Sequence, residues 1–145
     1  MPIGQFNIAR ARWPLHDPRM AGFVDNVVRI NRLAERTDGF IWRLIEDRGA
    51  EAPDFGGDEQ MTFTLSVWRD VDSLRHFTWS TLHKQFRLKT AEWFEKPTEA
   101  YLAIWPIAQG HRPDGAEAIA MLSELRRTGP TERVFGTETL TPVAA

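Results

Sequence analysis

The sequence contains no cysteine among its 145 residues. A chain without thiols cannot form disulfides, a thiolate zinc site, an iron–sulfur cluster or a cysteine nucleophile. An excess of either charge is also missing, because 18 basic residues face 20 acidic ones and the net charge is −2. This balance gives no attraction to phosphate backbones or anionic lipid surfaces. We therefore expect no nucleic acid and no membrane among its partners.

Long hydrophobic runs are absent as well. No segment reaches the roughly 18 apolar residues that a membrane-spanning helix needs, and the N-terminus lacks a basic stretch followed by an apolar one. The sequence therefore predicts a cytoplasmic protein.

Motifs that bind common cofactors are missing too. Gly56 and Gly57 lie in an acidic segment that would repel phosphate, and no glycine-rich loop follows a predicted strand. No Gly-x-Ser-x-Gly sequence marks a serine hydrolase, and no two histidines have the spacing of metal ligands. We expect no metal and no nucleotide cofactor.

Large rings are abundant instead, with six tryptophans and nine phenylalanines. Such rings dominate hydrophobic cores and dimer interfaces, and they also line pockets for flat organic ligands. Composition alone leaves both interpretations open.

The hydrophobic pattern predicts strands and helices in a definite order. Period-two alternation indicates strands, and a 3.6-residue period indicates helices. Four acceptors stand at predicted helix starts, namely Asp17, Asp70, Ser80 and Asp114, and the helices after Asp70 and Ser80 could form one bent helix. The predicted strands are residues 5–12, 40–45, 60–68 and 100–107, and the predicted helices begin near residues 18, 71, 81 and 114. Pro106 favours an edge position for the last of these strands.

The remaining segments carry little to bury. Residues 47–59 are rich in glycine and acids, which predicts an exposed, mobile connection, either a plain loop or a lid. Residues 134 and 135 could add a short fifth strand, and about 137–145 should form a frayed tail.

The order strand, helix, strand, strand, helix, strand is the split βαβ pattern. We predict an α+β class, with one ferredoxin-like βαββαβ domain over residues 1–145, an antiparallel four-stranded sheet and a C-terminal helical extension. Helices on one face would leave the other face without a cover, and a second copy is the simplest cover. We therefore expect a homodimer, a dimeric α/β barrel.

Short segments across the chain carry a family resemblance. They are residues 7–10, 17–20, 23–26, 39–44, 65–68, 83, 92–94 and 110–113. Together they resemble the family called domain of unknown function 3291 (DUF3291) over nearly the whole chain. The resemblance implies a fold of the dimeric α/β-barrel group, which includes antibiotic-biosynthesis monooxygenases, polyketide cyclases and some haem enzymes. It implies no particular reaction and no catalytic residue.

His83 and Arg87 are the candidates for catalysis. Their i, i+4 spacing places both on one face of a predicted helix, beside its apolar stripe. A proton-transfer group next to a fixed cation would suit an enolate, phenolate or carboxylate. The alternative is a surface pair that satisfies a backbone carbonyl and a glutamate.

The candidates for substrate binding carry an amide, an indole or a phenol. Amides near an apolar stripe need partners, which a ligand or the backbone could supply. Trp42 and Arg43 are neighbours on a strand and must point to opposite faces. The binding candidates are Asn7, Asn31, Trp42, Trp93, Tyr101 and Trp105, with the tryptophans as walls of a pocket between the sheet and the helix that carries His83.

Three functions remain open. The first is cofactor-independent monooxygenase or cyclase-like proton-transfer chemistry on an aromatic or polyketide-like substrate. The second is a haem-dependent enzyme with His83 as the axial ligand. The third is a non-catalytic dimer that binds a small organic ligand or has a structural role.

Overall fold

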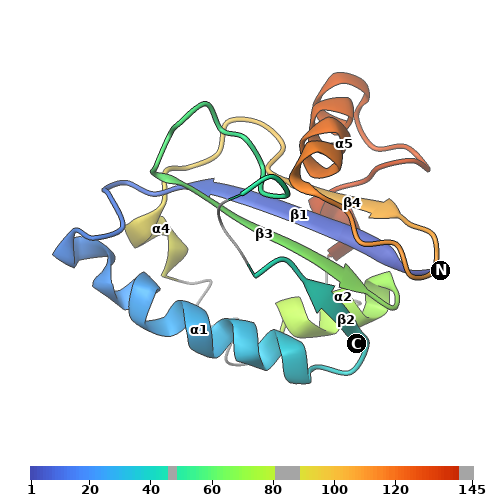
Figure 1. Cartoon of the computed structure of the whole chain (residues 1–145), viewed down its shortest axis with the longest axis horizontal. Helices are drawn as coiled ribbons and strands as arrows, with labels where there is room; N and C mark the ends of the chain where they lie inside the picture. The colour runs from blue at the N-terminus through green and yellow to red at the C-terminus, as the bar shows by residue number, and fades with distance from the viewer. Residues whose placement is uncertain (46–48, 81–88, 141–145) are drawn as a thin grey trace.

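The chain folds around an antiparallel sheet with the strand order β2-β3-β1-β4 (Figure 1). We analysed a computed structural model, which describes residues 1–45, 49–80 and 89–140. The strands are β1 (Ile3–Arg10), β2 (Phe40–Arg43), β3 (Met61–Trp68) and β4 (Leu102–Pro106). All neighbours pair antiparallel, and β4 lies at an edge as Pro106 predicted. The predicted α+β, ferredoxin-like class is confirmed.

Three of the predicted helix starts are confirmed by their capping hydrogen bonds. The side chains of Asp17, Asp70 and Asp114 each accept from a backbone N–H in the first turn that follows. The predicted segment 81–88 lies outside the described residues. The helices are η1 (Pro18–Met20), α1 (Ala21–Arg36), α2 (Val71–Thr78), α4 (Thr90–Trp93), α5 (Gly115–Thr128) and η2 (Thr137–Leu140).

One face of the sheet packs against α1 and α2. Trp68 is the centre of this cluster, since its ring stacks on Phe77 with centroids 5.3 Å apart and meets the edge of Phe40 at 5.4 Å. Ala34 of α1 and Leu74 of α2 are buried in the same cluster. The covering helices therefore hold one end of this face in a dry apolar core.

The C-terminal segment differs from its prediction. Residues 137–140, expected to fray, form η2, and Leu140 is buried in the α2 cluster. Trp79 Nε1 donates to the Leu140 carbonyl, and Arg75 donates to the Thr139 carbonyl. The predicted fifth strand is limited to a bridge in which Phe135 exchanges backbone hydrogen bonds with Ile104. The segment is held because it satisfies backbone acceptors and buries an apolar side chain.

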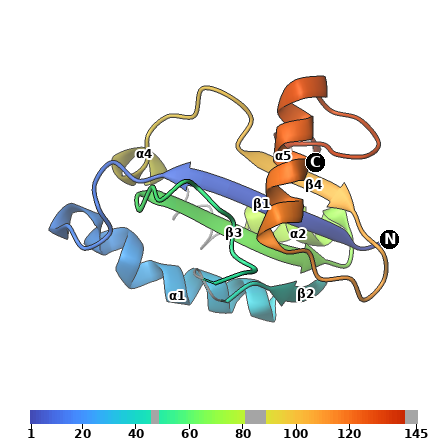
Figure 2. The ribbon, with the colours of Figure 1, turned by 45° about the horizontal axis from the view of Figure 1, so that its top comes forward.

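The opposite face of the sheet is covered by α5 of the same chain. Figure 2 shows α5 crossing in front of the sheet while α2 lies behind it. Beneath α5, Phe6, Val67 and Trp105 are at most 3% exposed. The expectation that this face lacks a cover within the chain was therefore wrong. The apolar stripe of α5, Ala118, Leu122 and Leu125, supplies it.

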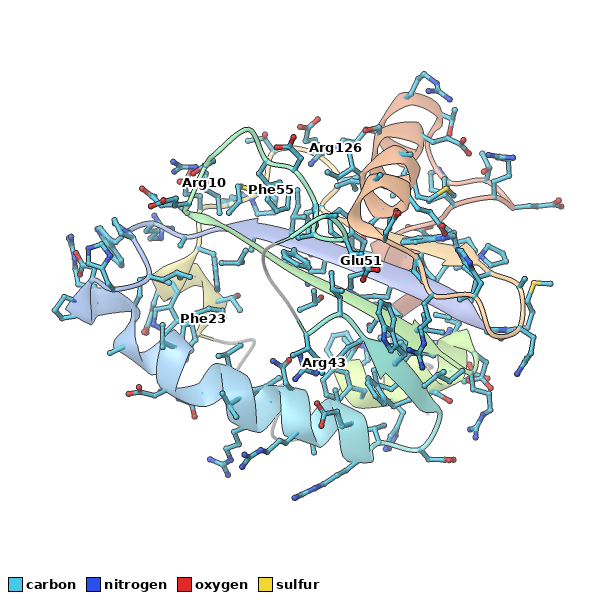
Figure 3. All side chains as sticks on the ribbon, in the orientation of Figure 1. Arg10, Phe23, Arg43, Glu51, Phe55 and Arg126 are labelled. Atoms are coloured by element: carbon cyan, nitrogen blue, oxygen red, sulfur yellow. The ribbon has the colours of Figure 1, made fainter. Side chains whose placement is uncertain are left out.

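The connection before β3 is anchored on this second face rather than free. The Glu51 carbonyl accepts from Gly115 N at 2.6 Å, and the Phe55 ring lies 6.2 Å from that of Phe63 (Figure 3). At its far end Arg10 donates to Asp58 over 2.9 Å, and this hydrogen bond is the main cause of the lowered pKa of the Asp58 carboxyl. The described part of the connection, residues 49–59, is thus tied at three points.

Gly115 permits the close contact between this connection and α5. A Cβ at position 115 would lie 2.2 Å from the backbone nitrogen of Pro53, and backbone atoms cannot rotate away. We expect Gly115→Ala to lower the free energy of unfolding by about 1–3 kcal/mol through overpacking. Urea denaturation measures it, with Ala116→Ser at the exposed neighbouring position as the control. A Gly115→Ala variant as stable as the wild type would show that the contact does not form.

Candidate functional site

The α1-facing side of the sheet carries polar side chains in its middle. Along β1, alternate residues face this side, and each is the direct cross-strand partner of a β3 residue. Gln5 lies opposite Ser66, and Asn7 lies opposite Thr64. We call these four residues the polar row. A sheet face beneath a helix is ordinarily apolar, so four polar residues at its centre mark a candidate site.

Apolar clusters bracket the polar row at both ends. Ile3 and Trp68 bury one end with Ala34 of α1. At the other end Phe23 of α1 meets the edge of Phe94 at 4.9 Å, in a cluster that also buries Ala11, Met20 and Trp93. α1 is therefore held to the molecule at both ends, and between them it packs beside β2 (Figure 1).

The polar row remains accessible from outside. Thr64 is exposed although β3 is an inner strand, and Asn7 on inner strand β1 is only half-buried. Gln5 and Ser66, by contrast, are 6% and 7% exposed. The row therefore has a buried end beside Trp68 and an accessible end at Asn7 and Thr64.

The side chains at the buried end of the polar row hydrogen-bond to one another, whereas Asn7 at the accessible end does not take part. Ser66 Oγ donates to Gln5 Oε1 at 2.7 Å, and Gln5 Nε2 donates to Thr64 Oγ1 at 3.1 Å. The next residue along this face, Thr62, donates to the Ala9 carbonyl at 2.8 Å. Asn7 differs, because its side-chain amide makes no hydrogen bond within the described parts of the chain. Among the described residues, its two donors and its acceptor therefore have no protein partner.

Arg43 is the charged group on the same side of the sheet. It lies opposite Ser66 across β2 and β3, and its Nε donates to Glu35 of α1 at 2.8 Å (Figure 3). Trp42 instead packs with the cluster on the other face, so the predicted divergence of Trp42 and Arg43 is confirmed. The sequence named Arg43 without assigning it to a site, and only the strand register places it there.

Asn7, Asn31 and Trp93 are the predicted binding residues on the α1 side. Asn7 belongs to the polar row. Asn31 is half-buried on α1, next to the buried Ile30. Trp93 is 7% exposed and packs so closely that a Cβ at Gly22 would lie 2.8 Å from its ring. Trp93 therefore packs against α1 as part of a core cluster.

The other three predicted binding residues lie elsewhere. Trp105 is buried under α5, where its Nε1 donates to Glu117 at 2.9 Å. The Trp42 ring lies on the same face, with the Arg112 guanidinium 5.8 Å from its centroid. Tyr101 is exposed just before β4. Trp42 and Trp105 thus stand on the opposite side of the sheet from Asn7 and Trp93, and the three tryptophans do not wall one pocket.

The predicted catalytic residues His83 and Arg87 lie outside the described residues, so their roles stay predictions. The polar row itself contains no ionisable side chain. Its members can bind and orient a ligand or stabilise a charge, and proton transfer needs another group. Within the described ranges, no group of three or more His, Asp or Glu residues could hold a metal ion. No helix in these ranges is long and apolar enough to cross a membrane.

The sheet and its helices define a ferredoxin-like α+β protein. The chain belongs to the DUF3291 family, a domain of unknown function, whose model matches residues 2–145. The resemblance noted in the sequence is confirmed. No curated protein matches the chain.

Solved structures share this fold at low sequence identity. Rv0793 from Mycobacterium tuberculosis is 11% identical, with a TM-score of 0.57 over 77% of this chain and 100% of that one. A conserved protein from Methanosarcina mazei is 16% identical, with a TM-score of 0.55 over 74% and 94%. SnoaB, a cofactor-independent oxygenase from Streptomyces nogalater, is 14% identical, with a TM-score of 0.52 over 74% and 94%. At these identities the likeness establishes the fold.

Proposed function

We propose that this protein binds a small organic molecule against the polar row, with Asn7 and Thr64 as its hydrogen-bonding partners. The unused amide of Asn7 carries the proposal. It sits on an inner strand, directly opposite the exposed Thr64, at a position where the packed face of a sheet usually carries an apolar side chain. A polar group in a partly dry place gains most from a ligand that supplies its missing hydrogen bonds.

The proposed chemistry is cofactor-independent oxygenation or a related proton transfer on an aromatic or polyketide-like substrate. The fold shared with SnoaB, itself a cofactor-independent oxygenase, supports it. Neutral donors such as Asn7 and Thr64 would stabilise the oxygen of an enolate. His83 would take the proton and Arg87 would hold the anion, as the sequence predicts.

An anthrone is a suitable probe because its enolate reacts with oxygen directly. Its methylene loses two hydrogens, one oxygen atom becomes the new quinone carbonyl, and the other leaves as water. We expect the protein to accelerate oxygen uptake by the anthrone dithranol. Asn7→Leu should reduce that acceleration by about tenfold or more, since one lost oxyanion donor costs roughly 10²–10³ in kcat where it is fully engaged. An oxygen electrode measures both, with spontaneous oxidation subtracted. Uptake equal to the spontaneous rate would argue against an oxygenase.

A haem enzyme with an axial His83 is the alternative that the sequence left open. It depends on a residue outside the described ranges and therefore stays a prediction. Protein purified from haem-supplied cells would then show a Soret band that His83→Ala removes.

We also propose that the protein is a homodimer. Since α5 covers much of the second face, the partner would cover only the side chains that stay half-buried there, namely Ile8 and Phe63 on the sheet and Met121 on α5. Such a contact should be reversible and depend on concentration. Sedimentation velocity at micromolar and nanomolar concentrations should find dimers that dissociate into folded monomers. A monomer at every concentration would contradict the dimer and leave the binding site unaffected.

A further inference from the structure

The hydrogen bonds of the polar row run in one direction. An indole N–H can only donate, and Trp68 Nε1 donates to Ser66 Oγ over 3.0 Å. Ser66 is buried, so its own proton needs an acceptor, and Gln5 Oε1 at 2.7 Å is that acceptor. The buried tryptophan therefore decides which way the Ser66 hydroxyl donates.

The orientation of the Gln5 amide in turn makes the Thr64 hydroxyl a hydrogen-bond acceptor. With Oε1 turned to Ser66, the amide presents Nε2 to Thr64 Oγ1 at 3.1 Å, and an amide nitrogen cannot accept. The reverse contact, from the Thr64 hydroxyl to Gln5 Oε1, is longer at 3.4 Å. Thr64 thus accepts from inside the protein, and its own proton is left for a group outside it.

We infer that Thr64 is a hydrogen-bond donor to the ligand, which must present an acceptor oxygen at this point. The inference rests on the proposed function and narrows its substrate class to ketones and other carbonyl compounds, in preference to ligands that offer only a donor. Asn7 lies directly opposite, and its amide adds a second donor to the same oxygen. Two donors on one carbonyl oxygen also stabilise the enolate that forms when a proton is lost beside it.

In this arrangement Trp68, Ser66 and Gln5 are positioning residues. They do not contact the ligand. Their hydrogen bonds act on it through Thr64, by fixing the direction in which the Thr64 hydroxyl donates. Thr62 provides a matched control, because it is the same residue type on the same strand and face but donates to the Ala9 carbonyl.

The test compares two probes of nearly equal shape. 1-Tetralone has a carbonyl oxygen, and tetralin lacks it. Protein-observed NMR titration should give the wild type a preference for 1-tetralone of about three- to tenfold, the value of one or two hydrogen bonds. Thr64→Val should reduce the preference at least threefold, Ser66→Ala should lower it because the Gln5 amide is no longer held, and Thr62→Val should retain it.

The outcomes separate this inference from the proposed function. A Thr64→Val variant that keeps the full preference would overturn the inference while the binding site stands. An equal loss in Thr62→Val would overturn it too, because the donor would not be specific to Thr64. If neither probe binds the folded wild type, the proposed site fails and the ligand assignment fails with it. The series of hydrogen bonds from Trp68 to Thr64 can be tested without ligand. Ser66→Ala should shift the indole N–H signal of Trp68, and an unmoved signal would show that the hydrogen bond between Trp68 and Ser66 does not form.

Discussion

Replacing His83 by alanine is expected to lower kcat for dithranol oxidation about 100- to 10,000-fold, the range typical of a lost general base. The reason is that the polar row carries donors and no group that can accept a proton at neutral pH, so the proton must go to a residue from another segment. Among the candidates in the sequence, His83 is the one whose spacing with Arg87 pairs a base with a cation. Steady-state oxygen uptake with the purified variant measures the effect.

The control for His83→Ala is His76→Ala. His76 is exposed on α2 and has no proposed role, so its variant should oxidise dithranol at the wild-type rate. A correctly folded His83→Ala protein with wild-type turnover would remove His83 from the mechanism. Binding of 1-tetralone by that same variant would show that the polar row still binds its ligand.

Leu122→Ala is expected to lower the free energy of unfolding by about 2–5 kcal/mol, the usual cost of emptying a buried leucine site. Leu122 is 4% exposed and lies in the cluster that α5 forms with Phe6 and Trp105. If α5 is the cover of the second face, its central leucine must contribute as a core residue does. Urea denaturation followed by tryptophan fluorescence measures the change.

Ser123→Ala serves as the control for Leu122→Ala. Ser123 is the next residue of α5 after Leu122 and is exposed, so this change should alter the free energy of unfolding by less than about 0.5 kcal/mol. A Leu122→Ala variant as stable as this control would mean that α5 is not packed on the sheet. The second face would then need the partner subunit that the sequence first suggested.

Local signals in the sequence were enough to predict the order of elements. The caps at Asp17, Asp70 and Asp114 form as the residue types require, and each hydrogen bond spans only two or three residues. Alternation likewise identified β3, because its side chains follow a period of two as far as Val67. Such features depend on neighbours in the chain, so a single sequence carries them.

The cover provided by α5 was not predicted, although its signal was present. The stripe of Ala118, Leu122 and Leu125 was read as an amphipathic extension, and such a stripe has to bury its apolar side somewhere. Short-range patterns do not say on which face of the sheet a helix will pack. The contact of Gly115 with Pro53 is equally long-range, and only the absence of a side chain at position 115 hinted at it.

The candidate site was recovered in part. Asn7 was singled out as an amide on a strand, and it lies in the polar row. Its partner Thr64 was not, because a threonine that alternates with apolar residues is ordinary for a strand. Gln5 and Ser66 are 61 residues apart, and their hydrogen bond depends on a register that one sequence does not specify. Trp42 and Trp105 were placed with Trp93 because, without that register, the face of the sheet on which each strand tryptophan lies could not be related to the helix that carries Trp93.

The most direct test of the account is an NMR titration of the wild-type protein with 1-tetralone, observing side-chain amide and indole N–H signals. We expect the Asn7 amide and the Trp68 indole to shift in proportion to occupancy, because the first contacts the ligand and the second heads the chain of donors that ends at Thr64. The indole of Trp105, on the opposite face, should remain unmoved. Shifts at Trp105 with none at Asn7 would contradict the account and place the binding site under α5.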